Sequence, residues 1–240
     1  MFMLKTINSG SSGNCYILDS GKEILILEAG VPFASVKKAI DYQTSRIVGV
    51  LSSHSHQDHR KYLHEYAQAG IPTLKGNEYS ESGLLYNAVG CVFFGDFIVS
   101  PFEVPHDVPC YGYQIEHPAI GKLVFVTDAK YVKYTFPKVN HIMVETNYSQ
   151  DILDENMNSG EIPKSLRDRI MKSHMSFDTA KEMVAANKNP MLKNVVMCHL
   201  SSRNSNKKRF KKEMQDITGQ FCDVTIAEKG IEVNLDLCPF

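Results

Sequence analysis

The side chains best suited to chemistry stand in one short run, where four metal-binding residue types fall within six positions: His54, His56, Asp58 and His59. The run follows the apolar residues 46–51, which predict a buried strand. Because side chains alternate along an extended segment, His54 and His56 point the same way and can hold one cation together. Residues 58–70 predict a helix that carries Asp58 in its first turn, so Asp58 and His59 turn toward a second position. This spacing suits two metal ions.

Three more ligand-type residues come after predicted strands: His106, Asp128 and His199. Strands fix such ligands at the rim of a sheet, while the loops leave a cation within reach of solvent. Taken alone, His106 could be a hydrogen-bonded loop histidine and Asp128 part of an Asx turn. Together with the first run they complete two groups, His54, His56 and His106 in one and Asp58, His59 and His199 in the other, with Asp128 placed to bridge them.

A ligand set of histidine and aspartate without cysteine suits zinc, manganese or iron rather than calcium or a structural thiolate zinc. Two such cations share a water, lower its pKa and hold both the attacking and the leaving oxygen of a displacement. Hydrolysis is therefore the expected reaction. The alternative is a polar, histidine-rich loop, but chance accounts poorly for this combination of residue types and spacing.

The elements that must position these residues alternate along the chain. Strands are predicted at residues 2–7, 14–18, 23–27, 46–51, 71–75, 97–104, 111–116, 122–127, 141–146 and 194–198, and residues 224–227 and 231–234 predict a terminal hairpin. Helices are predicted at residues 31–40, 58–70, 78–87, 163–171, 177–187 and 206–217. Mixed sheets with helices on the outside fit this order, which indicates an α+β fold.

Composition indicates an ordinary soluble protein with one domain over residues 1–240. The chain is 43% hydrophobic and 22% charged, and at this length it can bury a sizeable core. We find neither a signal peptide nor an apolar run long enough to span a membrane. The six cysteines are scattered and form no C-x-x-C pair, so reduced thiols in the cytoplasm are expected.

Basic charge is concentrated in one part of the chain, although the net charge is only −1. Residues 161–212 hold thirteen lysines and arginines against four acidic residues. Such a field favours a polyanionic partner, and a solvated helix face is the alternative. The candidates for contact with a nucleic-acid backbone are Arg203, Lys207, Lys208, Arg209, Lys211 and Lys212. Tyr111 and Tyr113 are weaker candidates for stacking on a base.

Several motifs resemble, in order, those of the YycJ/WalJ-like branch of metallo-β-lactamase-fold proteins. They lie at residues 8–16, 27–30, 54–59, 105–107, 111–113, 126–128, 145–147 and 198–204, over nearly the whole chain. The resemblance implies a four-layer αββα sandwich with two divalent ions at one edge of the sheets, held by the two groups above. It also implies a DNA exonuclease. The chain departs from the branch at Glu28, where aspartate is expected.

Two segments also resemble ribonuclease Z, a phosphodiesterase of the same fold. A histidine, His174, opens a helix about two dozen residues before the last ligand histidine, which stands in a His-x-Ser-x-Arg run at residues 199–203. The resemblance makes His174 a catalytic histidine that binds no metal. Our hypothesis for the mechanism adds Glu145 behind His174 and has Asp58 orient the attacking water and take its proton. A surface role for His174 is the alternative.

The main hypothesis is a metal-dependent nuclease, expected to be a DNA exonuclease, that uses a water held between two cations. Alternatives of the same fold are a hydrolase of a lactone, thioester or cyclic phosphodiester, and an RNA endonuclease similar to ribonuclease Z. From another class, the chain could be a DNA-binding or scaffold protein in which the metal site only stabilises the fold. The sequence does not determine the metal, the polarity of cutting or the oligomeric state.

Overall fold

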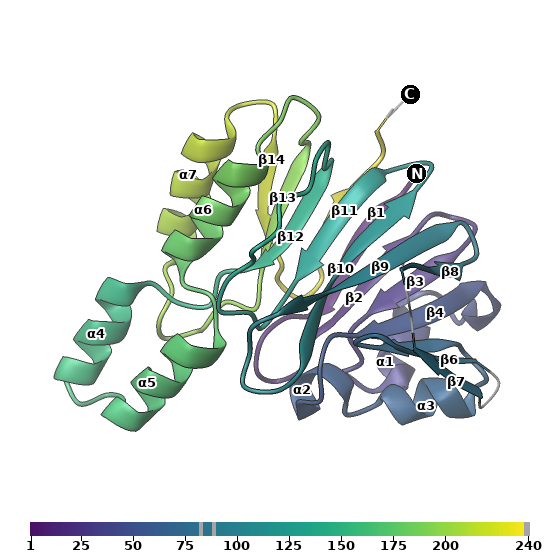
Figure 1. Ribbon diagram of the computed structural model, residues 1–240, viewed down its shortest axis with the longest axis horizontal. Helices are drawn as coiled ribbons and strands as arrows, with labels where there is room; N and C mark the ends of the chain where they lie inside the picture. The colour runs from purple at the N-terminus through teal and green to yellow at the C-terminus, as the bar shows by residue number, and fades with distance from the viewer. Residues whose placement is uncertain (82–83, 88–89, 238–240) are drawn as a thin grey trace.

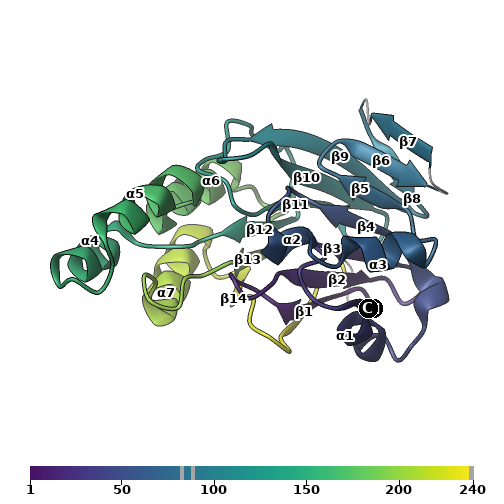
Figure 2. The same cartoon turned by 90° about the horizontal axis from the view of Figure 1, so that it is seen from below.

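The computed structural model of this chain describes residues 1–81, 84–87 and 90–237. Two mixed β-sheets stack face to face, with helices outside both (Figures 1 and 2). The first sheet has the strand order β15-β1-β2-β3-β4-β5-β6-β7, and the second has the order β14-β13-β12-β11-β10-β9-β8. Chain segments up to β7 thus build the first sheet, and only β15 returns to it from the C-terminal end.

The strands of the first sheet are β1 (Met3–Asn8), β2 (Cys15–Asp19), β3 (Ile24–Leu27), β4 (Ile47–Ser52), β5 (Thr73–Lys75), β6 (Glu78–Glu81), β7 (Leu84–Asn87) and β15 (Glu232–Asn234). Those of the second sheet are β8 (Val92–Phe94), β9 (Phe97–Val104), β10 (Cys110–His117), β11 (Gly121–Val126), β12 (His141–Glu145), β13 (Asn194–Cys198) and β14 (Asp223–Ile226). Strands β11 to β14 run parallel. Every residue of β12 and β13 is buried, as expected for parallel strands covered on both faces.

The helices are α1 (Phe33–Ala39), α2 (Gln57–Arg60), α3 (Leu63–Gln68), α4 (Gln150–Asn158), α5 (Lys164–Ser173), α6 (Phe177–Asn187) and α7 (Lys207–Thr218), with a short 3₁₀ turn at Thr44–Arg46. Helices α1 and α3 pack on the first sheet through Val36 and Tyr66. Helices α6 and α7 pack on the second through Val184 and Phe210. Because a third core of both sheets' side chains lies between the sheets, the molecule has the predicted four-layer αββα architecture.

Helices α4 and α5 stand apart from these layers and project from one end of the molecule (Figure 1). They pack on each other through a small apolar cluster of their own, which includes Leu153 and Ile162. No helix of the described residues is long and apolar enough to cross a membrane. The five cysteines in the described part of the chain are free thiols.

Three sequence predictions of secondary structure are wrong. Residues 78–87 are not a helix, because their described parts form the antiparallel strands β6 and β7. The terminal segments do not form a hairpin, because β14 pairs with β13 and β15 pairs with β1. The helix predicted over 58–70 is two short helices, α2 and α3. Helix α4 is absent from the prediction, whereas α6 has the predicted bounds.

Candidate metal centre

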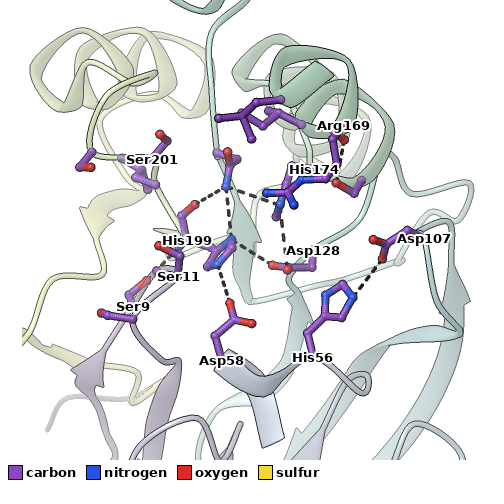
Figure 3. Close-up of a pocket in the computed structure, with 18 of the residues that line it drawn as sticks. Ser9, Ser11, His56, Asp58, Asp107, Asp128, Arg169, His174, His199 and Ser201 are labelled. Atoms are coloured by element: carbon purple, nitrogen blue, oxygen red, sulfur yellow. Dashed lines mark hydrogen bonds and ion pairs between the residues drawn. The ribbon is translucent and has the colours of Figure 1, made fainter. Parts of the chain in front are cut away.

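The metal-type side chains of the sequence prediction converge at one end of the sheets. Figure 3 shows four of them, His56, Asp58, Asp128 and His199. The ligand atoms of the predicted residues form two groups, each with all atoms within 4.8 Å of one another: His54, His56, His106 and Asp128 in the first group, and Asp58, His59, His199 and Asp128 in the second group. Asp128 belongs to both groups. A third set within the same distance joins Asp128 and His199 to the predicted catalytic residues Glu145 and His174. The loop after β4 supplies the histidine run, and the exits of β9, β11 and β13 supply the other three residues.

In the first group, hydrogen bonds at one ring nitrogen turn the other nitrogen inward. The Nδ1 atom of His106 lies 2.7 Å from the carbonyl oxygen of Ser173 and donates to it. The Nδ1 atom of His54 lies 2.8 Å from the hydroxyl of Ser53. The Nε2 atoms of both rings therefore face the group, and such outer contacts are what fix the tautomer of a ligating histidine.

In the second group, Glu28 plays the corresponding part. Its carboxylate lies 3.5 Å from Nδ1 of His59, and it accepts a hydrogen bond of 3.2 Å from the backbone N–H of Ser53. The Nε2 atom of His59 is 3.3 Å from carboxylate oxygens of both Asp58 and Asp128. Glu28 is thus the buried anion that orients His59 toward the group, although the family pattern has a shorter side chain there.

Besides Nδ1 of His59, which faces Glu28, two buried nitrogens of these groups have no hydrogen-bond partner among the described residues: Nε2 of His54 and Nε2 of His199. A buried polar atom without a partner is costly, so it calls for a ligand. Both atoms face carboxylate oxygens, Asp128 at 3.7 Å and Asp58 at 3.5 Å respectively. Facing imidazole nitrogens and carboxylate oxygens fit a divalent cation of the zinc, manganese or iron type.

The charges in the site are strongly coupled. Burial alone would raise the pKa of Asp128, but His199 and His59 outweigh it and hold that pKa well below its ordinary value. Burial together with His59 lowers the pKa of His54 to about 2, so this ring is neutral. A neutral imidazole and an ionised carboxylate are the protonation states that bind a metal.

Three residues of the site have a left-handed backbone, which is rare for residues other than glycine: Glu28 with φ 65°, Asp128 with φ 46° and His199 with φ 53°. Glu28 and His199 directly follow strands β3 and β13, and Asp128 stands two residues after the end of β11. Such conformations cost about 1–3 kcal/mol and persist where the surroundings require them. The turn at the end of each strand therefore directs a side chain to the site at the expense of local backbone strain.

The predicted catalytic pair is also in contact. Nδ1 of His174 lies 2.6 Å from Oε1 of Glu145. Burial lowers the pKa of His174, but Glu145 outweighs that effect and raises it above the ordinary value. Glu145 further meets Nδ1 of His199 at 3.0 Å and accepts from the backbone N–H of Ala129. It therefore ties the candidate acid–base histidine to the metal groups.

Sequence reasoning missed several residues that support the site. Asn14 approaches Nε2 of His59 at 3.1 Å, and Asn147 donates to the backbone oxygen of His199. Both residues stand in the motifs at 8–16 and 145–147, but the sequence does not reveal which group an asparagine side chain will hydrogen-bond. Asp107 lies 3.0 Å from Nε2 of His106 and 3.3 Å from Nε2 of His56. Because Asp107 directly follows His106 in the sequence, it could have been predicted to lie at the site.

A hollow of about 760 Å³ opens over the groups. We call it the main hollow. Its lining includes His56, Asp58 and His174, the loop Ser9–Ser12 on one side, and Arg169 of α5 on another (Figure 3). The candidate metal centre is therefore reachable by a substrate, and the wall formed by α5 carries a cation.

The predicted basic residues lie on and before α7. Lys207 and Arg209 are held in ion pairs with Glu228 and Asp151. A separate hollow of about 530 Å³ is lined by Lys207, Lys208, Lys211 and Lys212, and it shares no lining residue with the main hollow. This part of the chain therefore forms a second basic surface rather than a wall of the metal centre.

Three further histidines, His141, His117 and His64, belong to neither group. His141 is fully buried, with its Nδ1 2.8 Å from the side-chain amide of Asn194. His117 packs against the rings of Phe2 and Phe97, and His64 is exposed on α3. Tyr113 is fully buried, and its hydroxyl donates to the backbone oxygen of Ser52. The interior position of Tyr113 excludes it from stacking on a base.

Comparison with known proteins gives consistent relatives at low identity. No protein-family model matches the chain. It is 24% identical to the exodeoxyribonuclease YycJ of Bacillus anthracis, over 94% of this chain and 89% of the relative. It is also 24% identical to the exodeoxyribonuclease WalJ of Streptococcus pneumoniae, over 85% of this chain and 83% of the relative.

Among solved structures, the metallo-β-lactamase fold protein YhfI from Bacillus subtilis matches with a TM-score of 0.68 and 18% identity, over 97% of this chain and 98% of that one. The short form of human tRNase Z matches with a TM-score of 0.59 and 11% identity, over 97% and 99% of the two chains. The likenesses to solved structures show the fold, and the exodeoxyribonuclease relatives together with the ligand groups support a hydrolase with a divalent-metal site. The chain has the metallo-β-lactamase fold, and its resemblance to the YycJ/WalJ branch is confirmed.

Proposed function

We propose that this protein is a metal-dependent phosphodiesterase that cuts nucleic acid, and specifically a DNA exonuclease. The observation that carries the proposal is the pair of ligand groups that share Asp128 at the floor of an open hollow. Shared ligation of this kind is typical of two-metal hydrolases of phosphate esters. The exodeoxyribonuclease names of relatives that align with most of the chain support DNA as the substrate.

The groups would hold two divalent cations, zinc or manganese by their donor set, with His54, His56 and His106 at one, Asp58, His59 and His199 at the other, and Asp128 at both. When bound, such cations lower the pKa of a water and offset the charge that builds on the phosphoryl oxygens.

The chain's own residues would do the rest. The Asp58 carboxylate lines the main hollow, where it can orient the attacking water and accept its proton. His174 lines the same hollow and has a raised pKa, so it is protonated to higher pH than a free histidine. With Nδ1 held by Glu145, its Nε2 is free to donate a proton to the departing oxygen. Glu145 is thus a positioning residue for His174.

The surface of Arg203, Lys207, Lys208, Arg209, Lys211 and Lys212 is proposed to contact the phosphate backbone without reading bases. Lys208, Lys211 and Lys212 make no ion pair among the described residues, so they are the stronger members. Arg209 and Lys207 would have to exchange their carboxylate partners for phosphates. A substrate held both there and at the metal centre would have to be larger than a nucleotide.

Replacing Asp58 by alanine tests catalysis. Asp58→Ala should reduce cleavage of end-labelled DNA by at least about a thousandfold, because it removes both a ligand and the proton acceptor. Asp96→Ala, which removes an exposed carboxylate far from the site, should leave the rate unchanged. A time course on duplex DNA, single-stranded DNA and structured RNA with a panel of metals would show the substrate. Equal rates for the two variants would contradict the proposal.

A small-molecule hydrolase is the second candidate, since a hollow of about 760 Å³ lies within the range of small-ligand sites. Including a chromogenic phosphodiester, a lactone and a thioester in the same assay separates the two. Turnover of one of these small substrates by the wild-type protein, with none of any polynucleotide, would favour this second candidate.

A further inference from the structure

A smaller hollow of about 340 Å³ adjoins the candidate metal centre. We call it the flanking hollow. The loop after β4 lines it with Ser52–Ser55 and lines the main hollow with His56, Gln57 and Asp58. The loop after β9 also contributes to both hollows, because Asp107 lines the main hollow and Pro109 lines the flanking hollow. The same two loops therefore separate a catalytic hollow from a neighbouring one, and His54 lines the latter.

The flanking hollow carries cations without partners. Arg60 at the end of α2 and Lys75 at the end of β5 both line it. In the described part of the chain neither side chain makes an ion pair or a hydrogen bond, unlike Lys207 and Arg209 on the α7 surface. One carboxylate, that of Glu78, lines the same hollow. Two free cations against one anion leave a local field that favours an anionic ligand.

An aromatic ring completes the wall. Tyr111, at the start of β10, is half-buried and lines the flanking hollow. Its ring packs so closely over Gly76 that a Cβ built there would lie 2.5 Å from Tyr111 Cδ2. Its backbone N–H donates to the oxygen of Ser53 in the loop after β4. The ring is therefore held in place, and it lines the flanking hollow together with the two cations. Asn77 also lines the hollow, and its side chain makes no hydrogen bond among the described residues.

We propose that the flanking hollow binds the nucleotide next to the scissile phosphate, with Arg60 and Lys75 at its phosphate and Tyr111 against its base. This inference rests on the proposed nuclease function. Pockets of about 300 Å³ are at the small end of ligand sites, so the hollow suits one nucleotide and not a duplex. The nucleic-acid strand would thus be unpaired next to the phosphodiester bond that is cut. Stacking on an aromatic ring tolerates every base, so no sequence preference is expected.

The test compares two substrates. Bis(p-nitrophenyl) phosphate needs only the metal centre, whereas a single-stranded thymidine oligonucleotide also reaches the flanking hollow. The double variant Arg60→Gln/Lys75→Gln should lower kcat/KM for the oligonucleotide at least tenfold and leave that for the chromogenic diester within twofold. The matched control Lys38→Gln/Lys229→Gln removes the same charge from exposed sites that line neither hollow, and it should change neither value.

Tyr111 is tested by two substitutions. Tyr111→Phe keeps the ring and should retain oligonucleotide cleavage, whereas Tyr111→Leu should lose about tenfold, the effect of removing one base–aromatic contact. Equal losses on both substrates in the charge variant would indicate damage to the metal centre and overturn the proposal. Unchanged oligonucleotide cleavage in that variant would do the same.

A binding measurement keeps this inference separate from the proposed function. Thymidine 5′-monophosphate and inorganic phosphate are titrated into the metal-loaded full chain and into the charge variant. The wild-type protein should bind the nucleotide at least tenfold more tightly than phosphate, and the charge variant should bind the nucleotide at least tenfold more weakly than the wild type does. If the wild type cleaves no oligonucleotide, the nuclease proposal fails, but this comparison still decides the subsite. Equal affinities for the two ligands would overturn it.

Discussion

At the scale of single residues, Glu28 shows how a buried anion can serve a site without touching a substrate. It is fully buried, has a left-handed backbone and faces the ring nitrogen of His59 that points away from the groups. A carboxylate in that place fixes the tautomer of the ring and increases its basicity as a ligand. The glutamate that departs from the family pattern therefore keeps this orienting role.

Glu28→Gln tests this role. The variant loses the anion but keeps the shape, so metal affinity should fall by about 10–100-fold, the usual effect of removing such an outer partner. Competition with a chromogenic chelator measures the affinity. Glu232→Gln, an exposed change on β15, is the control. An affinity for Glu28→Gln within twofold of the wild type would refute the role.

His141 gives the fold a dependence on pH that does not involve the site. Burial lowers its pKa from the ordinary 6.5 to about 4. The unfolded chain therefore takes up a proton that the folded chain resists, so the stability present above pH 6.5 is lost as the pH falls toward 4. Between pH 7 and 5 this amounts to about 2 kcal/mol of the free energy of unfolding.

Urea unfolding of His141→Gln measures this pH-dependent part of the free energy of unfolding. The variant should lose about 2 kcal/mol less than the wild type between pH 7 and pH 5, since glutamine does not titrate. His64→Gln, at an exposed position on α3, should follow the wild-type curve. If the free energy of unfolding fell equally with pH in the wild type and in His141→Gln, His141 would not be the source of the pH dependence.

At the scale of elements, the loop after β4 is fixed by close packing. Gly30 lies so near α2 that a Cβ there would be 1.8 Å from the backbone oxygen of Asp58 and 2.5 Å from the backbone nitrogen of Asn14. The backbone N–H of Asn14 donates to that same oxygen at 2.7 Å. The position of Asp58 is thus set by the segment after β3.

Gly30→Ala should therefore displace Asp58, lower the metal content per chain from two toward one and cost about 1–3 kcal/mol of stability by overpacking. Metal analysis and thermal unfolding give both values. Gly160→Ala meets no atom within 4 Å, although its φ is +82°, so it should cost about 1 kcal/mol in strain and leave the metal content at two. Two bound metals in Gly30→Ala would contradict this.

The sequence was informative where a local pattern decides the structure and where several metal-binding residue types stand close together. The histidine run predicted one wall of the site, and the helix predicted over 177–187 is α6, which the Ser176 side chain caps. The sequence failed where pairing is distant, since β14 and β15 are neighbours in the chain yet join different sheets. Residues 78–87 have helix-forming glutamates and leucines, but their described parts pair as strands. Orienting contacts such as that of Glu28 require three-dimensional proximity, which no spacing reveals.

At the scale of the whole molecule, the candidate ligands come from both sheets. The loop after β4 in the first sheet gives His54 to His59, and strand ends of the second sheet give His106, Asp128 and His199. Bound cations would cross-link the two sheets at that end. Without them, Nε2 of His54 and Nε2 of His199 have no hydrogen-bond partner among the described residues.

Removing metal should therefore lower the melting temperature. Metal present at about a thousand times its dissociation constant stabilises the folded state by about 4 kcal/mol, which corresponds to roughly 10 °C for a chain of this size. Calorimetry with and without a chelator measures the shift, and added zinc or manganese should restore it. Asp128→Ala should show little response to the chelator. An unchanged melting temperature in the wild type would argue against metal in these groups.

The late position of His199 also bears on how the protein is made. Synthesis on the ribosome delivers the histidine run before His199, because β13 follows β4 in the chain. A chain translated only as far as β12 consequently lacks a member of the second group, and the proposed nuclease should not cut nearby nucleic acid before His199 has emerged.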